Sequence, residues 1–402
     1  MRLKSLALLL LALPAAAFAQ RGGAPRMIDI PAMPEPATPT SARRLLSVIA
    51  ADSMEGRAIW RPGSDRAAKY IAEQMRALGL VPGGDSGYFQ KIAGAVQPLT
   101  GRVARLPKLS DLDTVPPDRR RIAVNVVGIL AGKPNVMDTV QTANGPTVMA
   151  RRDSVVIVAA HYDHIGITRP VNGDSINNGA DDDASGTVAI LEIARIMKKW
   201  PTPSRSVVFV AFTGEETGGI GTRQYMDTPV RPLTATAAQL QIEMIGRPDT
   251  LGMGPGRAWL TGYERSTMGE TFQRYGLSIV PDPRPSQGFF SRSDNYAFAR
   301  QGIPAHTLSS FNLHTDYHQP SDEVSKVDFD HMSKMINVGA KATWILTEGP
   351  SPQWLPGQRP CPPPPPGTAV PGGGRGRGGT PMTPAQMDSM RLANAYPRSC
   401  VM

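Results

Sequence analysis

Five short segments of the sequence place histidines and acidic residues close together, and these residue types can bind metal. The segments are His161–His164 (HYDH), Asp181–Asp183 (DDD), Glu215–Glu216 (EE), Glu243 and His314–Asp322 (HTDYHQPSD). All six histidines of the chain lie between residues 161 and 331. Imidazole and carboxylate ligands together suit zinc, and carboxylates can bridge two ions. The residue types therefore predict a metal centre built from segments that are far apart in the chain.

Each segment also has an ordinary explanation when it is taken alone. The acids 181–183 precede a predicted helix, where carboxylates meet free backbone N–H groups. Glu215 and Glu216 could form a solvated pair. Glu243 lies in the apolar run 240–245, where an unpaired carboxylate is costly to bury. Because three adjacent acids repel one another, and because the clusters fall at the ends of predicted strands, we favour the metal site.

Two apolar runs rich in β-branched residues predict the strands that position these groups. They are 155–160 (VVIVAA) and 207–212 (VVFVAF), and both are typical of buried strands. Between them, 185–200 carries apolar residues at helical spacing, which predicts a right-handed βαβ unit. The first strand runs into HYDH and the second into GEE. Ligands bind at the carboxyl ends of strands in open α/β sheets, so the chemistry is expected at that edge.

The rest of the body continues this alternation of helical and strand patterns. Two helical stretches are predicted within 41–80, strands at 122–130, 238–245 and 303–308, and a terminal helix at 328–348. Residues 134–152 are expected to form a polar surface excursion. The alternation predicts an α/β domain with a mostly parallel sheet.

The remaining histidines receive different predictions. His314 and His318 are four residues apart, but Pro320 and its neighbours disfavour a helix there, so only one of the two is expected to bind metal. His306 lies in a predicted apolar strand and is expected to be a hydrogen-bonded core histidine. His331 lies in the terminal helix and is expected at the surface.

The succession of motifs resembles the dizinc exopeptidases of metallopeptidase family twenty-eight, which include secreted aminopeptidases, glutamate carboxypeptidase II and glutaminyl cyclases. HYDH, GADDDASG, TGEE, IEMIG and YHQPSDE occur in the family's order, and the similarity covers roughly residues 41–348. The resemblance implies a three-layer α/β sandwich with a mixed, mostly parallel central sheet flanked by helices. It also implies two zinc ions per chain and a peptide substrate.

The resemblance assigns a role to each matching position. The implied metal ligands are His161, Asp182, Glu216, Glu243 and His318. Asp182, the middle acid of its run, would bridge both ions; His161 and Glu243 would complete one site, and the other two ligands the second. Glu215 would be the general base that takes a proton from water and passes it to the leaving amine. Asp163 would accept a hydrogen bond from the nonligating ring nitrogen of His161.

Two positions depart from the family's pattern. Glu243 stands where the best-known aminopeptidases have Asp, and Ser293-Asp294-Asn295 ends in Asn where the familiar segment has His. The leading prediction is a secreted zinc aminopeptidase that removes N-terminal residues from peptides. A carboxypeptidase of the glutamate carboxypeptidase type is the alternative within the same class, and Glu243 keeps it open. Arg292 and Tyr317 are candidates for lining the specificity pocket.

Two further activities on the same fold are weighed against the leading one. Glutaminyl cyclase is a transferase that uses a single zinc, and the complete two-metal set argues against it. From a different class, the chain could be a catalytically inactive binding protein. Such a protein is expected to have lost ligands or the base, and none is missing here.

The N-terminus has the features of a cleaved secretory signal, assigned to residues 1–19. Arg2 and Lys4 precede the apolar stretch 6–13, and Ala-Phe-Ala precedes Gln20. The apolar stretch is well short of the roughly 20 residues that span a bilayer. We therefore expect export to the periplasm or the cell exterior, with no stable membrane anchor after cleavage. The predicted mature chain has a Pro-rich N-terminus (20–40), a catalytic domain (41–350) and a Pro/Gly/Arg-rich flexible tail (351–402).

The formal net charge of +9 belongs largely to the two ends of the chain. Two of the nine charges come from the first four residues and four come from the segment beyond residue 350. The arginines of the tail alternate with glycines and lack interleaved aromatic residues, and an exported chain rarely meets RNA, so no nucleic-acid partner is predicted. Cys361 and Cys400, the only cysteines, could pair in an oxidising compartment. The oligomeric state is left open.

Overall fold

The computed structural model describes residues 27–142, 145–250 and 252–362. The predicted signal segment and most of the predicted tail, including Cys400, lie outside the described residues, so the predictions made for them remain predictions. Among the helices that the structure describes, none is both long and apolar enough to cross a membrane.

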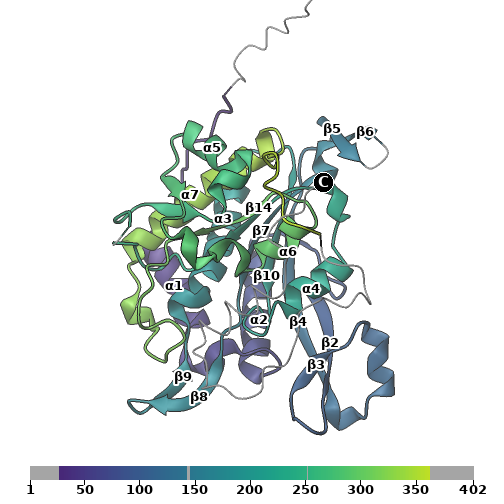
Figure 1. Ribbon diagram of the computed structural model, residues 1–402, viewed down its shortest axis with the longest axis vertical. Helices are drawn as coiled ribbons and strands as arrows, with labels where there is room; N and C mark the ends of the chain where they lie inside the picture. Colours follow the sequence, from purple (N-terminus) through teal and green to yellow (C-terminus); the bar gives the residue numbers. More distant parts are fainter. Residues whose placement is uncertain (1–26, 143–144, 251, 363–402) are drawn as a thin grey trace, which may run out of the picture.

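A ten-stranded sheet forms the centre of the described structure (Figure 1). Its strands are β1 (Val81–Pro82), β2 (Phe89–Val96), β3 (Val103–Arg105), β4 (Arg120–Leu130), β7 (Val155–His161), β10 (Ser206–Phe212), β11 (Thr236–Ile242), β12 (Ala258–Leu260), β13 (Ile279–Pro281) and β14 (Ala305–Ser309). Their order is β13-β12-β14-β11-β7-β10-β4-β2-β3, with β1 paired to β4. Two separate hairpins pair β5 (Met137–Thr142) with β6 (Gly145–Ala150) and β8 (Gly166–Val171) with β9 (Asp174–Asn177).

The four strands at the centre of the sheet are parallel. β10 pairs with β7, β7 with β11 and β11 with β14, all in parallel, whereas β4 and β12 join this group from either side in the antiparallel sense. Every residue of β7, β10 and β11 is buried. Continuous Val, Ile, Ala and Phe runs suit strands that are covered on both faces. The parallel arrangement places the carboxyl ends of these four strands at one edge of the sheet.

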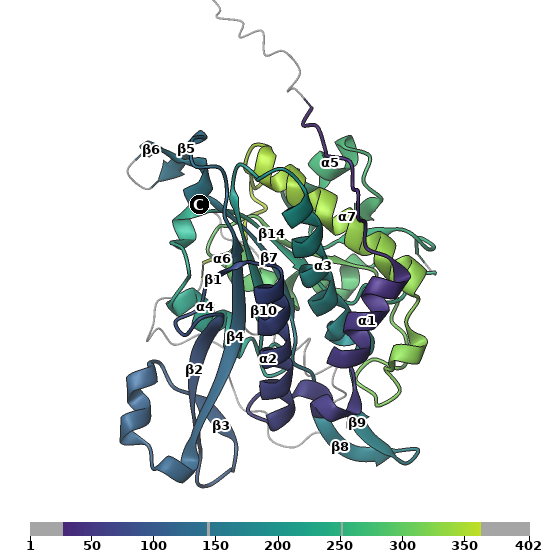
Figure 2. The same cartoon turned by 180° about the vertical axis from the view of Figure 1, so that it is seen from behind.

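Helices cover both faces and complete three layers (Figures 1 and 2). The helices are α1 (Pro39–Ile49), α2 (Pro62–Ala77), α3 (Gly186–Lys199), α4 (Ile220–Asp227), α5 (Thr267–Arg274), α6 (Asn295–Arg300) and α7 (Phe329–Glu348). Alternate residues of β7 face opposite sides, as the two-residue period of a strand requires. Val156 and Val158 join one buried cluster with residues of α1, α2, α3, α5 and α7, whereas Val155 and Ile157 join a second cluster with residues of α4 and α6.

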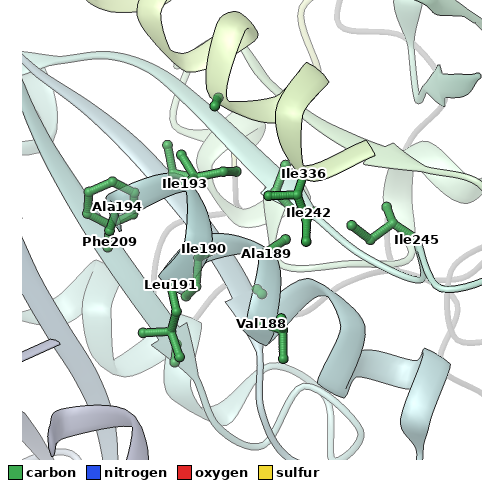
Figure 3. Close-up of a cluster of buried hydrophobic side chains, with 14 of the residues drawn as sticks. Val188, Ala189, Ile190, Leu191, Ile193, Ala194, Phe209, Ile242, Ile245 and Ile336 are labelled. Carbon is green, nitrogen blue, oxygen red and sulfur yellow. The ribbon is translucent and has the colours of Figure 1, made fainter. Parts of the chain in front are cut away.

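Helix α3 lies at the centre of the larger cluster and is buried along most of its length. Figure 3 shows its apolar side chains packing with Phe209 of β10, Ile242 of β11 and Ile336 of α7. Burying such a side chain contributes roughly 1.5–3 kcal/mol. The helix that follows the acidic loop is therefore held firmly against the sheet, and it holds the loop's C-terminal end in place.

The α/β fold predicted from the sequence is confirmed, with shifts at element ends. β11 stops at Ile242, so Glu243 follows the strand instead of lying within it. Asp328 is the N-cap of α7, and its carboxylate accepts from the main-chain N–H of His331 at 2.9 Å. The predicted polar excursion at 134–152 contains the β5–β6 hairpin.

Segments on both sides of the predicted catalytic domain pack against it. Trp344 and Trp200 donate from their indole nitrogens to the carbonyls of Asp29 and Ala32. Trp354 donates to the carbonyl of Gly302 and contacts the ring of His306. The packed body thus includes described residues that composition alone placed in the two terminal segments.

Candidate metal centre

The predicted site residues lie at the carboxyl edge of the central strands. His161 is the last residue of β7 and pairs with Phe212, the last residue of β10. The acids that follow β10 and β11 reach the same edge because all three strands run in the same direction. A pocket at this edge is lined by His161, Asp182, Glu215, Glu216 and Glu243, among other residues.

The three adjacent acids have different hydrogen-bond partners. The carboxylate of Asp181 accepts from the amide of Gly246 at 2.7 Å, and that of Asp183 accepts from the amides of Gly186 and Met244 at 2.9 and 3.0 Å. The carboxylate of Asp182 accepts from no main-chain amide of the described residues. The outer two acids are therefore hydrogen-bonded to the main chain, and the middle one is left lining the pocket.

Asp322 fixes the main chain of this acidic loop from the other side. Its carboxylate accepts from the amides of Asp181 and Asp182 at 3.0 and 3.1 Å. Arg247 donates to Asp322 at 3.0 Å and to Asp316 at 2.7 Å. The Asp of the QPSDE motif thus positions the loop that carries Asp182.

A buried arginine from outside these motifs joins the two loops that flank the pocket. Arg57 is fully buried, and its guanidinium donates to the carbonyls of Tyr162, Asn178 and Gly179 at 2.6, 2.6 and 3.0 Å, and to that of Ile49 at 3.0 Å. Burial lowers the pKa of Arg57 to about 10, while the nearby aspartates act in the opposite direction. The side chain remains a cation at neutral pH and connects the HYDH loop to the acidic loop.

The carboxylate of Asp182 lies between two groups of ligand atoms. Its Oδ1 is 3.3 Å from Nε2 of His161, and its Oδ2 is 3.2 Å from Nε2 of His318. Neighbouring ligands of one tetrahedral zinc lie about 3.3 Å apart when the metal–ligand bonds are near 2.0–2.1 Å. Each oxygen of Asp182 is thus spaced to share an ion with a different histidine.

Contacts of Nδ1, the ring nitrogen of His161 that faces away from Asp182, orient the ring. Nδ1 lies 3.1 Å from the main-chain carbonyl of Asp163 and 3.7 Å from the carboxylate of the same residue. The sequence prediction named the carboxylate as the partner; in the structure the carbonyl is nearer, and the carboxylate accepts from the amide of Glu215 at 3.2 Å. Asp163 therefore contacts both the predicted ligand and the predicted base.

A second group of ligand atoms surrounds Glu216. Asp182, Glu216, His318 and His164 each offer an atom within 4.8 Å of the others. Nε2 of His318 lies 3.1 Å from Oε2 of Glu216, and it is buried without a hydrogen bond to any described residue. His318 has a backbone φ of +57°, which is strained for a residue with a side chain. An unpaired imidazole nitrogen directed at two carboxylates fits a metal ligand.

The pocket concentrates negative charge. Burial raises the pKa of Glu215 well above its usual range and that of Glu243 to about 7, although nearby His161 lowers both. The hydroxyl of Ser293 also donates to Glu243. Burial opposes the charge of His318, but its contacts with Asp182 and Glu216 outweigh burial and raise its pKa to about 11. Divalent cations would reverse this crowding penalty, so the donor set fits zinc.

The other histidines separate by environment. His314 donates from Nε2 to Asp181 at 3.0 Å, outside the group around Glu216, so of this pair only His318 faces the pocket. His306 is fully buried and hydrogen-bonded to Thr261 and Ser266, as predicted for a core histidine. The surface prediction for His331 is wrong: it is 1% exposed. Its ring contacts the hydroxyl of Ser310 and the amide of Gly256, because the first turn of α7 packs against those loops.

Several residues that shape the site were not identified from the sequence. Arg57, His164, Asp294 and Asp322 have no motif that marks their partners, since those partners lie from 52 to more than 140 residues away. Asp294 is buried and accepts from the hydroxyl of Thr222. Position in the sequence was the available signal. His164 and Asp322 lie inside segments already selected for their metal-binding residue types, and Asp294 lies inside the family segment 293–295.

The sequence profile of Peptidase family M28 matches residues 137–343. The chain belongs to peptidase family M28. This M28 chain is 24% identical over 256 residues to a probable zinc metalloprotease of Leptosphaeria maculans, covering 54% of this chain and 58% of that protein. It is 28% identical over 203 residues to leucine aminopeptidase 1 of Ajellomyces capsulatus, covering 46% of this chain and 51% of that protein. The chain thus spans little more than half the length of these two curated relatives.

The fold of this M28 chain is similar to that of several solved structures. The zinc aminopeptidase BSAP from Bacillus subtilis superposes with a TM-score of 0.55 at 15% identity, covering 78% of this chain and 96% of that one. Glutaminyl cyclase of Porphyromonas gingivalis superposes with a TM-score of 0.51 at 12% identity, covering 76% and 97%. Because different reactions are named for these neighbours, the shared fold alone does not select the reaction.

Proposed function

We propose that this M28 chain is a zinc-dependent exopeptidase, and that it removes N-terminal residues from peptides. The observation that carries the proposal is the placement of Asp182, whose two oxygens lie 3.3 and 3.2 Å from histidines on opposite sides. That spacing suits two ions held by one bridging carboxylate. The relatives named as a zinc metalloprotease and an aminopeptidase support the same reaction class.

Each of the two proposed zinc sites takes Asp182 and two further ligands. His161 and Glu243 would complete one site, and Glu216 and His318 the other. Bound zinc would supply a polarised scissile carbonyl and a water with a pKa lowered to near 7. Three protein ligands per ion leave room for substrate and water, as a catalytic site requires.

Glu215 is proposed to move the proton. Its main-chain amide is tied to Asp163, and its carboxylate lines the pocket beside the ligands. A general base must lie within hydrogen-bond reach of the proton that it takes. We infer that a Glu215 oxygen accepts a proton from water and returns it to the leaving amine. Its neighbour Glu216 is committed to a different role, because its oxygens face His164 and His318.

The walls of the pocket favour an apolar side chain next to the scissile bond. Trp259 and Phe289 are stacked with ring centroids 5.3 Å apart, and Phe311 contacts Phe289 and Tyr317. These rings line the pocket together with the acids. Aromatic faces bury apolar substrate groups well.

Carboxypeptidase action is the second candidate, and Arg292 is the observation that favours it. Arg292 lines both the small pocket and an adjoining cleft of about 590 Å³. Its guanidinium lies over the ring of Phe289 at 5.1 Å, and it forms no ion pair with a carboxylate of the described residues. An arginine so placed could bind the free carboxylate of a peptide.

A panel of peptides tests the two candidates. The aminopeptidase proposal predicts turnover of free-amine aminoacyl substrates, loss of turnover with chelator and recovery with zinc. Preference for N-blocked peptides with a free carboxylate would replace it with carboxypeptidase action. Binding of peptides without turnover of either kind, at full zinc loading, would indicate the inactive binding protein.

We also propose that the protein is exported, on the basis of residues 1–19. The basic start, short apolar stretch and small residues before Gln20 support removal of this segment during export. N-terminal sequencing of protein recovered from the periplasm or medium tests the proposal. A mature chain found only inside the cell with Met1 retained would contradict it.

A further inference from the structure

Two histidines contact Glu216, and each faces a different oxygen. Nδ1 of His164 lies 2.9 Å from Oε1, and Nε2 of His318 lies 3.1 Å from Oε2. His164 follows β7 by three residues, whereas His318 comes from the loop that precedes α7. Both rings are near enough to the cluster to be considered as ligands. The detailed contacts separate their roles.

The first difference is hydrogen-bond geometry. The contact between His164 and Oε1 is a hydrogen bond at normal length. Nε2 of His318 makes no hydrogen bond with the described residues, although it lies within 3.2 Å of oxygens from Asp182 and Glu216. Such spacing without hydrogen bonding is expected of two groups directed at one ion. Oε2 of Glu216 is therefore the oxygen on the side of the metal.

The second observation concerns the opposite nitrogen of the His164 ring, compared with that of His161. A histidine that binds metal almost always donates its other N–H to a carboxylate, carbonyl or water. His161 follows this rule, because its Nδ1 lies 3.1 Å from the carbonyl of Asp163. Nε2 of His164 is buried and has no partner among the described residues. If Nδ1 bound metal, the N–H at Nε2 would lack the acceptor that orients a metal-binding ring, whereas the ring of His161 has one.

Neighbouring groups hold the ring of His164 in place. Gly179 packs against it at a backbone φ of +53°, and a Cβ at that position would come within 2.6 Å of the ring carbons. On another side, the ring of His318 meets it edge to face at 5.5 Å between centroids. The ring therefore stays where its Nδ1 meets Oε1 of Glu216.

We propose that His164 is a positioning residue and not a metal ligand. It donates from Nδ1 to Oε1 of Glu216 and leaves Oε2 as the single oxygen available to the metal. Without this hydrogen bond, Glu216 could rotate and bind with both oxygens, which would occupy the position that substrate or water needs. The inference rests on the two-zinc site of the proposed function.

Two variants at position 164 test the role. His164→Asn places an amide N–H near the position of Nδ1 and keeps the donor. His164→Leu removes the hydrogen-bond donor and replaces the imidazole with a side chain of similar size. Zinc affinity would be measured by competition with a chromophoric chelator, and the ligand geometry by the visible absorption of the cobalt-substituted protein. Thermal unfolding of each metal-free variant checks that the fold is intact.

The expected result is a loss of about 10–100-fold in zinc affinity at one of two sites in H164L, the usual scale for a group that orients a ligand. H164N should recover most of this affinity and keep the cobalt spectrum of the unaltered protein. Equal weakening in both variants with altered cobalt spectra would make His164 a ligand and overturn the proposal. Unchanged affinity in H164L would also overturn it. If the unaltered protein binds fewer than two zinc ions, the two-metal function itself is wrong.

Discussion

Two acidic clusters meet at the run Asp181–Asp183, and the fold treats them in opposite ways. In the first, Asp181 meets His314 and the amide of Gly246, while Asp322 meets Arg247 and two further amides. In the second, Asp182 faces Glu216 and histidines across a pocket, and no amide of the described residues donates to its carboxylate. Both clusters are buried and rich in acids.

The difference between the clusters lies in which donors the fold supplies. The first, which we call the structural cluster, is balanced by protein groups and needs no ion. Burial raises carboxylate pKa values in both clusters, that of Asp322 to about 6 in the first and that of Glu243 to about 7 in the second, which we call the pocket cluster. The two clusters therefore differ in the hydrogen-bond partners of their acids. A candidate metal centre is thus recognised by carboxylates that lack hydrogen-bond donors from the protein, and a group of acidic residues alone does not identify one.

Exchanging Asp182 should have the largest effect. Asp182→Asn removes the carboxylate shared by both sites, so zinc binding should fall at both and turnover by at least about 10³-fold, since a metal contributes several kcal/mol to the transition state. The measurements are zinc content per chain and kcat/KM.

Asp181→Asn is the matched control in the structural cluster. It should keep both zinc ions and lower the unfolding free energy by about 1–3 kcal/mol, because a buried hydrogen-bonded group loses a partner. Equal loss of zinc in both variants would erase the distinction between the clusters.

Exchanging Glu215 should separate chemistry from metal binding within the pocket cluster. Glu215→Gln should keep two zinc ions while turnover falls by about 10²–10⁴-fold, the scale of general base catalysis. Zinc analysis and steady-state kinetics on the same preparation check this. Normal turnover with zinc retained would remove Glu215 from the mechanism.

The pair His318 and His314 extends the comparison to histidines. His318→Ala should lower the zinc content towards one ion per chain. His314→Ala should keep both ions and destabilise the fold by about 1–3 kcal/mol, because Asp181 loses its buried partner. Metal analysis and chemical unfolding distinguish them; two zinc ions in the His318 variant would exclude it as a ligand.

Exchanging His306 should leave zinc binding unchanged and should be visible only as a change in the pH dependence of stability. Burial lowers its pKa to about 4, so between pH 6.5 and 4 the unfolded chain binds the proton that the folded chain refuses. Stability from this group is therefore full above pH 6.5 and falls as the pH drops, by up to about 3 kcal/mol. Unfolding with chelator present should show a flatter profile in His306→Asn. If stability depended on pH with the same slope in the unaltered protein and in the variant, groups other than His306 would cause the acid sensitivity.

The main strands and the candidate metal ligands could be predicted from the sequence, because both follow from local sequence pattern. The β-branched runs that became β7 and β10, and the acids beyond them, depend on neighbours in the chain. The hydrogen-bond partners of each acid do not depend on neighbours in the chain. Asp322 reaches the acidic loop across 141 residues and Arg57 across 121, so no spacing could assign them. His331 was misplaced for the same reason, since its burial depends on a loop 21 residues away.

Anomalous diffraction at the zinc edge, from crystals of the unaltered protein grown with zinc, tests the central claim most directly. If Asp182 bridges two ions, two peaks should flank it, each roughly 2.0–2.2 Å from a different one of its oxygens. One peak should also contact His161, and the other His318. A single peak, or two peaks of which one does not contact Asp182, would contradict the claim that this carboxylate bridges two ions.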